Sequence, residues 1–140
     1  MVDDIIVRLK TAPVLKLVAG AADFSTAAES RPKALPAAYV LPLHERTLGD
    51  EEIGCGVTQV VEATLGVAIA VVNVSDAKGG AAVAGLDAIR LAVRKALLGW
   101  VPDGCEDGFE YAGGALLGFA GNVLWWQDAY SILYVLDAPG

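Results

Sequence analysis

One segment, residues 57–74, constrains the fold more than any other part of the chain. Its odd positions from Val57 to Val71 are almost all apolar, whereas its even positions are mainly small or polar. Such alternation is typical of a β-strand that buries one face. At about 3.3 Å per residue this strand would run to roughly 60 Å, while strands usually have about 5 to 6 residues. One end is therefore expected to overshoot a compact domain, with Gly66 at a bend or bulge.

The residues before this segment supply a partner strand. Residues 37–45 are predicted to be a strand, with Pro42 at an edge position or a bulge, because proline donates no hydrogen bond to a neighbouring strand. Residues 44–56 are polar and acidic and are predicted to form a turn or mobile tip. The two strands and this tip predict a β-hairpin that projects from the domain. A curved or broken strand within a monomer is the alternative.

Helical periodicity is clearest over residues 2–10 and 82–97. Weaker patterns indicate an extended piece over 14–18 and a helical turn over 21–29. Further strands are expected over 109–112, 115–119, 123–128 and 129–137. We therefore predict one α+β domain over residues 1–140, with a mixed, mainly antiparallel sheet, two main helices packed on one face and a projecting hairpin.

The composition favours a protein that associates with other proteins. Hydrophobic residues make up 55% of the chain and charged residues only 19%, so part of the apolar surface is expected to be buried between subunits. The net charge is −7, and every Lys and Arg lies at or before Lys95. Because nucleic-acid binding depends on basic groups that neutralise phosphates, this composition does not favour a DNA or RNA reader.

No motif predicts catalysis, a cofactor or a metal site. His44 is the only histidine, and Cys55 and Cys105 show no CxxC spacing, so the motifs assemble neither a zinc site nor a nucleophile with a histidine base. Gly79-Gly80 precedes a helix, but no Lys-Ser/Thr of a phosphate-binding loop follows. The cysteines are expected to be free thiols in a reducing compartment. We predict no catalytic, cofactor-binding or metal-binding residues.

Neither export nor membrane insertion is predicted. The N-terminus carries Asp3 and Asp4 where a signal peptide carries basic residues. The most apolar stretches, 65–74 and 112–126, are shorter than the roughly 18 to 20 residues that a membrane-spanning helix requires.

Aromatic residues gather in the C-terminal strands. Trp125 and Trp126 are adjacent, so in a strand they point to opposite faces of the sheet. One is expected in the core, and the other is suited to anchor a subunit interface if nothing in the subunit covers it; a structural role for both is the alternative. The residues predicted to form the subunit interface are Val57, Gln59, Val60, Glu62, Trp125, Trp126 and Tyr130.

The succession of several segments resembles one known family. In chain order these segments are residues 36–42, the long strand over 57–74, Asp76 with Gly79, the helix end over 96–102, Tyr111-Ala112-Gly113-Gly114 and Trp126-Gln127. Together they resemble the tail terminator, or tail completion, proteins of long-tailed bacteriophages and prophages. The likeness covers most of the chain and contains no catalytic signature.

The resemblance implies a structural protein of the virion tail, assembled in the host cytoplasm, that forms a hexameric ring on the end of the tail tube. Such a ring stops tail growth and offers a surface for head attachment. Its partners would be copies of itself, the tail tube protein and a head–tail connector protein, with DNA only as passing cargo and no membrane. An acidic lumen would let DNA pass without binding, and we assign three residues to it as a hypothesis: Asp50, Glu51 and Glu52.

Two other functions stay open at this stage. One is a head–tail connector or stopper protein in the same virion. The other is a dimeric, small-ligand-binding α/β module of bacterial origin. An enzyme that uses an acidic pair such as Glu106 and Asp107 is the weakest alternative, because nothing in the spacing recommends it.

Overall fold

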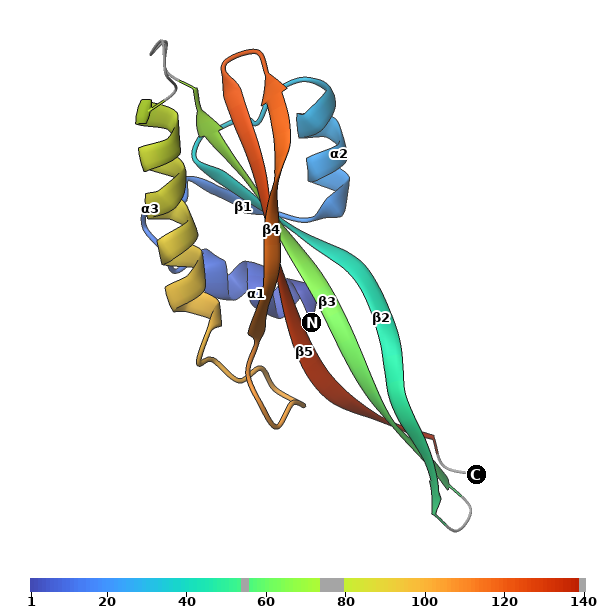
Figure 1. Cartoon of the computed structure of the whole chain (residues 1–140). Coiled ribbons are helices and arrows are strands. Elements are labelled where there is room, and N and C mark those ends of the chain that lie inside the picture. Colours follow the sequence, from blue (N-terminus) through green and yellow to red (C-terminus); the bar gives the residue numbers. More distant parts are fainter. Residues whose placement is uncertain (54–55, 74–79, 139–140) are drawn as a thin grey trace.

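The long alternating segment is the central strand of a five-stranded sheet (Figure 1). The computed structural model describes residues 1–53, 56–73 and 80–138. Its strands are β1 (Leu17–Ala19), β2 (Ala37–Ile53), β3 (Gly56–Val72), β4 (Glu110–Ala120) and β5 (Val123–Ala138), in the spatial order β1-β2-β3-β5-β4. Its helices are α1 (Val2–Leu9), α2 (Ala21–Glu29) and α3 (Gly80–Leu97). β1 pairs with β2 in parallel and the other pairs are antiparallel, so the predicted α+β class with a mixed, mainly antiparallel sheet is confirmed.

Strand alternation divides the core between the two faces of the sheet. On one face, Val67 and Ile69 of β3 pack in one cluster with side chains of α1 and α3, among them Leu9 and Val93. Figure 1 shows these two helices on the same side of the sheet and α2 on the other. The pairing of two main helices on one face follows from the apolar stripes that both carry.

The opposite face is also covered, by α2. Tyr39 and Trp125 pack there with Ala27 of α2 and with Ala68 and Ala70 of β3. The even positions of β3 are small at this point because the rings of Tyr39 and Trp125, 5.8 Å apart, occupy the space above them. The weak helical pattern over 21–29 thus marks a real helix, and the small residues opposite it are core residues.

β2 does not end where its apolar pattern ends. The predicted turn over 44–56 is wrong for residues 44–53, which continue the strand as far as Ile53, and residues 54–55 lie outside the described part of the chain. Backbone pairing with β3 outweighs the polar composition here, since every backbone group that pairs gains a hydrogen bond whatever its side chain. The register shifts between Pro42 and His44 and again between Thr47 and Gly49, so the predicted bulge at Pro42 is confirmed.

The expected two-stranded hairpin is not confirmed in that form, because a third strand accompanies it. β5 pairs with β3 from Val57–Ala138 to Val72–Val123 without a register shift. The strands predicted over 123–128 and 129–137 are therefore one strand, as are those over 109–112 and 115–119.

Gly66 is not at a bulge of β3, whose register with both neighbours is regular at that point. A Cβ at Gly66 would lie 3.1 Å from the side chain of Gln127 and 3.2 Å from that of Leu43. The glycine therefore makes room for side chains of the two flanking strands. Gly99, by contrast, has a φ of +88° just after α3, a conformation that glycine commonly supplies where a helix ends.

Candidate subunit interface

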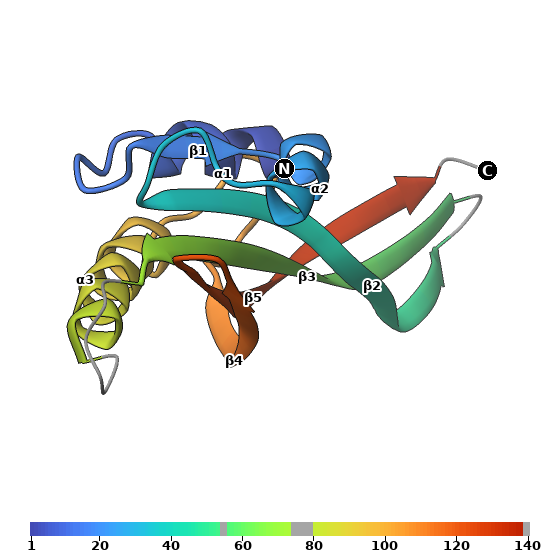
Figure 2. The same cartoon turned by 90° about the horizontal axis from the view of Figure 1, so that it is seen from above.

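The far ends of three strands form a separate part of the sheet, which we call the extension: residues 44–53 of β2, 56–62 of β3 and 132–138 of β5. β1 pairs only with residues 37–39 of β2, and β4 begins opposite Ser131 of β5. Among the described residues, no strand therefore pairs with the outer edge of β2 or of β5 in the extension. Figure 2 shows the three strands running out beyond the helices. Open strand edges carry backbone donors and acceptors that can pair with another chain.

Apolar side chains of the extension are exposed to an unusual degree. Leu133, Val135 and Leu136 of β5 are 40%, 46% and 47% exposed, and Leu48 of β2 is 47% exposed. Val60 of β3 lies directly opposite Val135 and is half-buried. Exposed apolar residues that cluster on one part of a protein are typical of contact surfaces between proteins.

Polar pairs across the strands fix the shape of the extension. Arg46 Nε donates to Glu62 Oε1 at 2.8 Å, and the hydroxyl of Thr58 donates to Asp137 at 2.9 Å. The Tyr134 hydroxyl donates to Glu45 at 3.0 Å, and this hydrogen bond adds to burial in raising the pKa of Tyr134. These pairs hold neighbouring strands in register without covering their apolar side chains.

The predicted interface residues of β3 all lie in the extension. Val60 and Glu62 face the side of the sheet that bears α2, and Gln59 faces the other side. Val57 pairs with Ala138 at the far end of β3, and its side chain lies outside the described part. Their role in an interface stays a prediction.

The predicted lumen residues Asp50, Glu51 and Glu52 lie in β2 and not in a loop. Their backbones pair with Gln59, Thr58 and Val57 respectively. Their side chains lie outside the described part of the chain. Their assignment to a lumen therefore stays a prediction.

The aromatic residues predicted for the interface are placed mainly inside the subunit. Trp125 and Tyr130 are buried, on opposite faces of the sheet. Trp126 is half-buried and lies on the face opposite to Trp125, as predicted for adjacent strand residues. Arg90 of α3 lies over its ring, 4.6 Å from the centroid. This packing favours the structural role for the aromatic residues, and their part in an interface stays a prediction.

A buried polar cluster around Asp128 was not predicted from the sequence. Asp128 is 0% exposed and accepts two hydrogen bonds from Arg90, each 3.0 Å long. Its Oδ1 also accepts from Trp126 Nε1 at 2.9 Å and from the Tyr111 hydroxyl at 3.1 Å. The bond to Asp128 is the main cause that raises the pKa of Arg90, against the opposing effect of burial. The cluster ties α3, β4 and β5 together, and the only sequence signal for it was an acid between apolar stretches.

β4 adds a second apolar surface at the other end of the sheet. Its outer edge pairs with no strand among the described residues, and it exposes Leu116, Leu117 and Phe119. Gly113 and Gly118 adopt positive φ angles beside two register shifts. A Cβ at Gly114 would lie 2.5 Å from the Asp128 side chain, so only glycine leaves room for the polar cluster at this position.

Three further features of the described residues concern metal sites, membrane-spanning helices and cysteine thiols. Across residues 1–53, 56–73 and 80–138, no group of three or more metal-binding side chains comes together. In the same ranges, no helix is both long and apolar enough to span a bilayer. Cys105 is a free, half-buried thiol whose pKa is raised by burial, and Cys55 lies outside the described residues.

Comparisons with known proteins agree with the fold. A structure described as "Virion of native gene transfer agent (GTA) particle" contains a chain that matches with a TM-score of 0.50 and 15% identity, covering 94% of this chain and 84% of that one. At this identity the likeness concerns the fold alone. No curated protein matches the sequence. The family model described as "Phage tail terminator protein" matches residues 2–138. The chain therefore belongs to the phage tail terminator protein family.

Proposed function

We propose that this protein forms a ring of identical copies that caps the tail tube, ends tail polymerisation and offers the surface to which the head joins. Membership of the family gives it a structural role in the phage tail. The observation that carries the proposal is the extension, which has two different open edges and exposed apolar side chains on β2 and β5.

Two different edges favour a ring over a symmetric dimer. When the β2 side of one copy meets the β5 side of the next, the contact is heterologous, and such contacts close into a ring if the rotation between copies returns to its start. We propose six copies, which at 14.4 kDa each give 6 × 14.4, or about 86 kDa. A dimeric ligand-binding module would give 2 × 14.4, or about 29 kDa.

The proposed ring is assembled in the host cytoplasm and has the tail tube protein and a head–tail connector protein as its other partners. Its chain carries a net charge of −7. A negatively charged passage repels DNA, which then moves through as cargo without being bound. The acidic residues 50–52 of the extension are our candidates for the lining of this passage.

Particles made without the protein test its place in the virion. If the protein ends polymerisation, electron micrographs of such particles show tails longer than in the wild type. Tails of normal length beside detached, leaking heads contradict this function and instead support the connector alternative.

A matched pair of valine variants tests the role of the extension. Val135→Lys places a charge on the apolar surface of β5, whereas Val7→Lys places the same charge on α1, where Val7 is 67% exposed. We expect Val135→Lys to give overlong tails and Val7→Lys to restore normal ones when each replaces the wild-type protein. If both variants restore normal tails, the extension is not the assembly surface.

A further inference from the structure

A pocket of about 480 Å³ lies between α2 and the beginning of the sheet, away from the extension. Its apolar lining includes the buried residues Val18 of β1, Ala27 of α2 and Tyr39 of β2. Arg31 and Lys33, both exposed, lie at its rim just after α2. A pocket with apolar walls and a few polar groups at defined positions is typical of a binding site.

Tyr39 places a hydrogen-bond donor in this pocket. It is 1% exposed, and its hydroxyl has no hydrogen-bond partner in the described ranges of the chain. Its ring is held by edge contacts with Phe24 at 5.8 Å and by Trp125. Burial, followed by the nearby carboxylate of Asp23, raises the pKa of Tyr39, so the hydroxyl keeps its proton. The hydroxyl faces the pocket and can donate to an acceptor that a ligand brings.

The charge of the pocket favours an acidic ligand. Arg31 and Lys33 contribute two positive charges and Asp23 one negative charge, so the ionised residues that line it carry a net charge of +1. Lys16, which precedes the lining residue Leu17, is exposed and adds a further positive charge nearby. Carboxylates are the acceptors that such a rim attracts.

The same chain carries a surface of the opposite charge in the loop between α3 and β4, residues 98–109. Asp103, Glu106 and Asp107 are exposed there, and the loop contains no Lys or Arg. We call these residues and their backbone the acidic loop.

The acidic loop is held in one shape by its own packing. Trp100 stacks on Phe109 with ring centroids 6.0 Å apart, and Pro102 is buried. The backbone closes so tightly that a Cβ at Gly108 would lie 2.8 Å from the carbonyl oxygen of Trp100. A loop that is already ordered loses little conformational entropy on binding.

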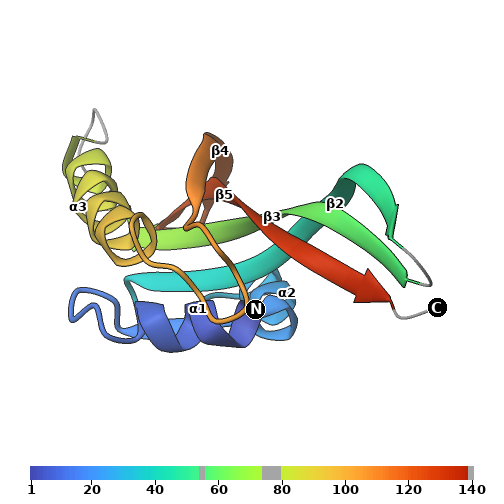
Figure 3. The ribbon, with the colours of Figure 1, turned by 90° about the horizontal axis from the view of Figure 1, so that it is seen from below.

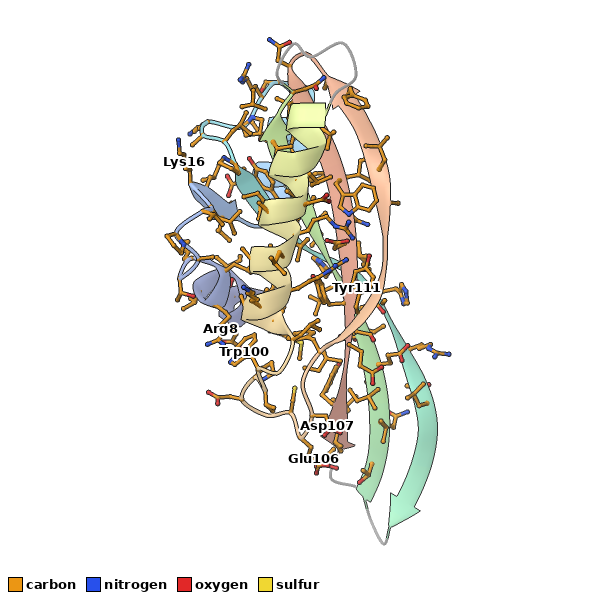
Figure 4. The ribbon with its side chains drawn as sticks, turned by 60° about the vertical axis from the view of Figure 1, so that its left-hand side comes forward. Arg8, Lys16, Trp100, Glu106, Asp107 and Tyr111 are labelled. Atoms are coloured by element: carbon orange, nitrogen blue, oxygen red, sulfur yellow. The ribbon has the colours of Figure 1, made fainter. Side chains whose placement is uncertain are left out.

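One copy cannot place its own acidic loop in its own pocket. Figure 4 shows Lys16 and the pair Glu106 and Asp107 far apart along the molecule. The pocket also lies beside β1, the outer strand on the β2 side of the sheet. The acidic loop lies on the other side, where Glu106 and Asp107 line a groove of about 210 Å³ with Leu133 and Val135 of β5.

We propose that the pocket between α2 and β1 of one copy binds the acidic loop of the next copy in the ring. Carboxylates of the loop pair with Arg31 and Lys33, and one of them accepts from the Tyr39 hydroxyl. The pocket lies on the β2 side of one copy and the acidic loop lies on the β5 side of the next. The new contact therefore joins the same two sides as the proposed contact between the β2 and β5 edges. This inference rests on the proposed ring and adds a charged, specific contact to its apolar one.

Charge reversal on each side tests the pairing. Variant A is Arg31→Glu with Lys33→Glu, and variant B is Glu106→Lys with Asp107→Lys. Each replaces the wild-type protein during phage assembly, and normal-length tails are counted by electron microscopy. Alone, each places like charges opposite one another, and we expect about a tenfold or greater loss of normal tails. Together, A and B can alternate around the ring with every contact complementary, so their co-expression restores normal tails.

Two controls separate this contact from general effects. Lys10→Glu with Lys95→Glu changes the net charge as variant A does, but at exposed sites just after α1 and on α3, and it is expected to leave tails normal. Thermal unfolding of A and B shows whether each variant is folded. The combination of all four substitutions in one chain is expected to restore normal tails without a second variant.

The outcomes distinguish this inference from the proposed function. Normal tails with A alone or B alone overturn the inference while leaving the ring intact. A loss with A but not B shows that something other than the acidic loop occupies the pocket, which also overturns it. Loss with both and no restoration by co-expression overturns the pairing. If particles without any copy of the protein have tails of normal length, the proposed function itself fails.

Discussion

The two ends of β3 lie in very different surroundings although they belong to one uninterrupted strand. From Val61 to Val71 its odd residues are buried under α1, α3 and the loop that follows α3. Past that point, apolar neighbours on β5 such as Val135 are nearly half exposed. Figure 3 shows the helices over the first part, which we call the body, and the extension leaving them. An apolar strand is thus a core element only where another element covers it, and elsewhere its apolar neighbours stay exposed to solvent.

The same contrast holds for the ion pairs. Arg90 and Asp128 form a bidentate pair in the body, where Asp128 is fully buried. Arg46 and Glu62 form a pair in the extension with one short contact and a largely exposed arginine. Burial makes the loss of one partner costly, whereas water compensates for it at the surface.

The largest effect is expected from Asp128→Ala. The change leaves Arg90 without its counter-ion in a site that is only partly open to water, and removing one partner of a buried pair costs about 3 to 5 kcal/mol. Urea denaturation followed by tryptophan fluorescence measures the change in the free energy of unfolding. If the free energy of unfolding falls by less than about 1 kcal/mol, the body tolerates the unpaired charge of Arg90 as well as the extension tolerates an unpaired charge.

A pair of leucine variants compares the two regions directly. Leu65 of β3 is 5% exposed in the body and Leu133 of β5 is 40% exposed in the extension. Leu65→Ala is expected to lower the free energy of unfolding by about 2 to 5 kcal/mol, as for other buried leucines. Leu133→Ala is expected to lower it by less than about 1 kcal/mol, because water already reaches this side chain. Equal losses would contradict the division into body and extension.

Alkaline pH is expected to act mainly on the body. Burial raises the pKa of Tyr130 above its ordinary value of 10.0, and the nearby Asp128 raises it further. Unfolded chains therefore lose this proton first as pH rises above about 10, so the stability due to Tyr130 is complete below that pH and is lost above it. Tyr130→Phe is expected to make the free energy of unfolding fall less between pH 8 and pH 10.5. Urea denaturation at these two pH values measures the change. Tyr134→Phe, in the extension, should change this decline less.

The smallest effect is expected from Glu62→Gln, which breaks the pair with Arg46. Exposed pairs contribute little, and salt screens what they contribute. Relative to the wild-type protein, the midpoint of urea denaturation should fall only slightly at low salt, and the fall should be smaller still at high salt. A large, salt-independent shift would mean that this part of the extension is covered even in the isolated protein.

Much of the fold could be predicted because its signals are local. The period-two pattern of residues 57–74 identified β3, and the apolar stripe over 82–97 identified α3. Polar residues 44–53 misled the prediction of β2, because strand pairing is decided by the backbone of a partner that composition does not reveal. Gly66 misled it as well, because its role depends on Leu43 and Gln127 in the flanking strands.

The candidate sites were less accessible to sequence reasoning. The cluster around Asp128 joins residues from three elements, and the pocket beside α2 joins residues from β1, α2 and β2. Neither set has a recognisable spacing along the chain. The apolar character of the extension could be anticipated, but which strands border it depended on β5 reaching as far as Ala138.

The pairing of β3 with β5 also dictates when the protein can finish folding. Val57 pairs with Ala138, which follows it by 138 − 57, or 81, residues. β2 and β3 are adjacent in the chain and can join early, but the other side of β3 stays bare until the C-terminal strand has been synthesised. Contacts between residues so distant in sequence form slowly. Newly made chains therefore pass through a period in which their most apolar strand is open to other chains, and during this period they are prone to aggregate.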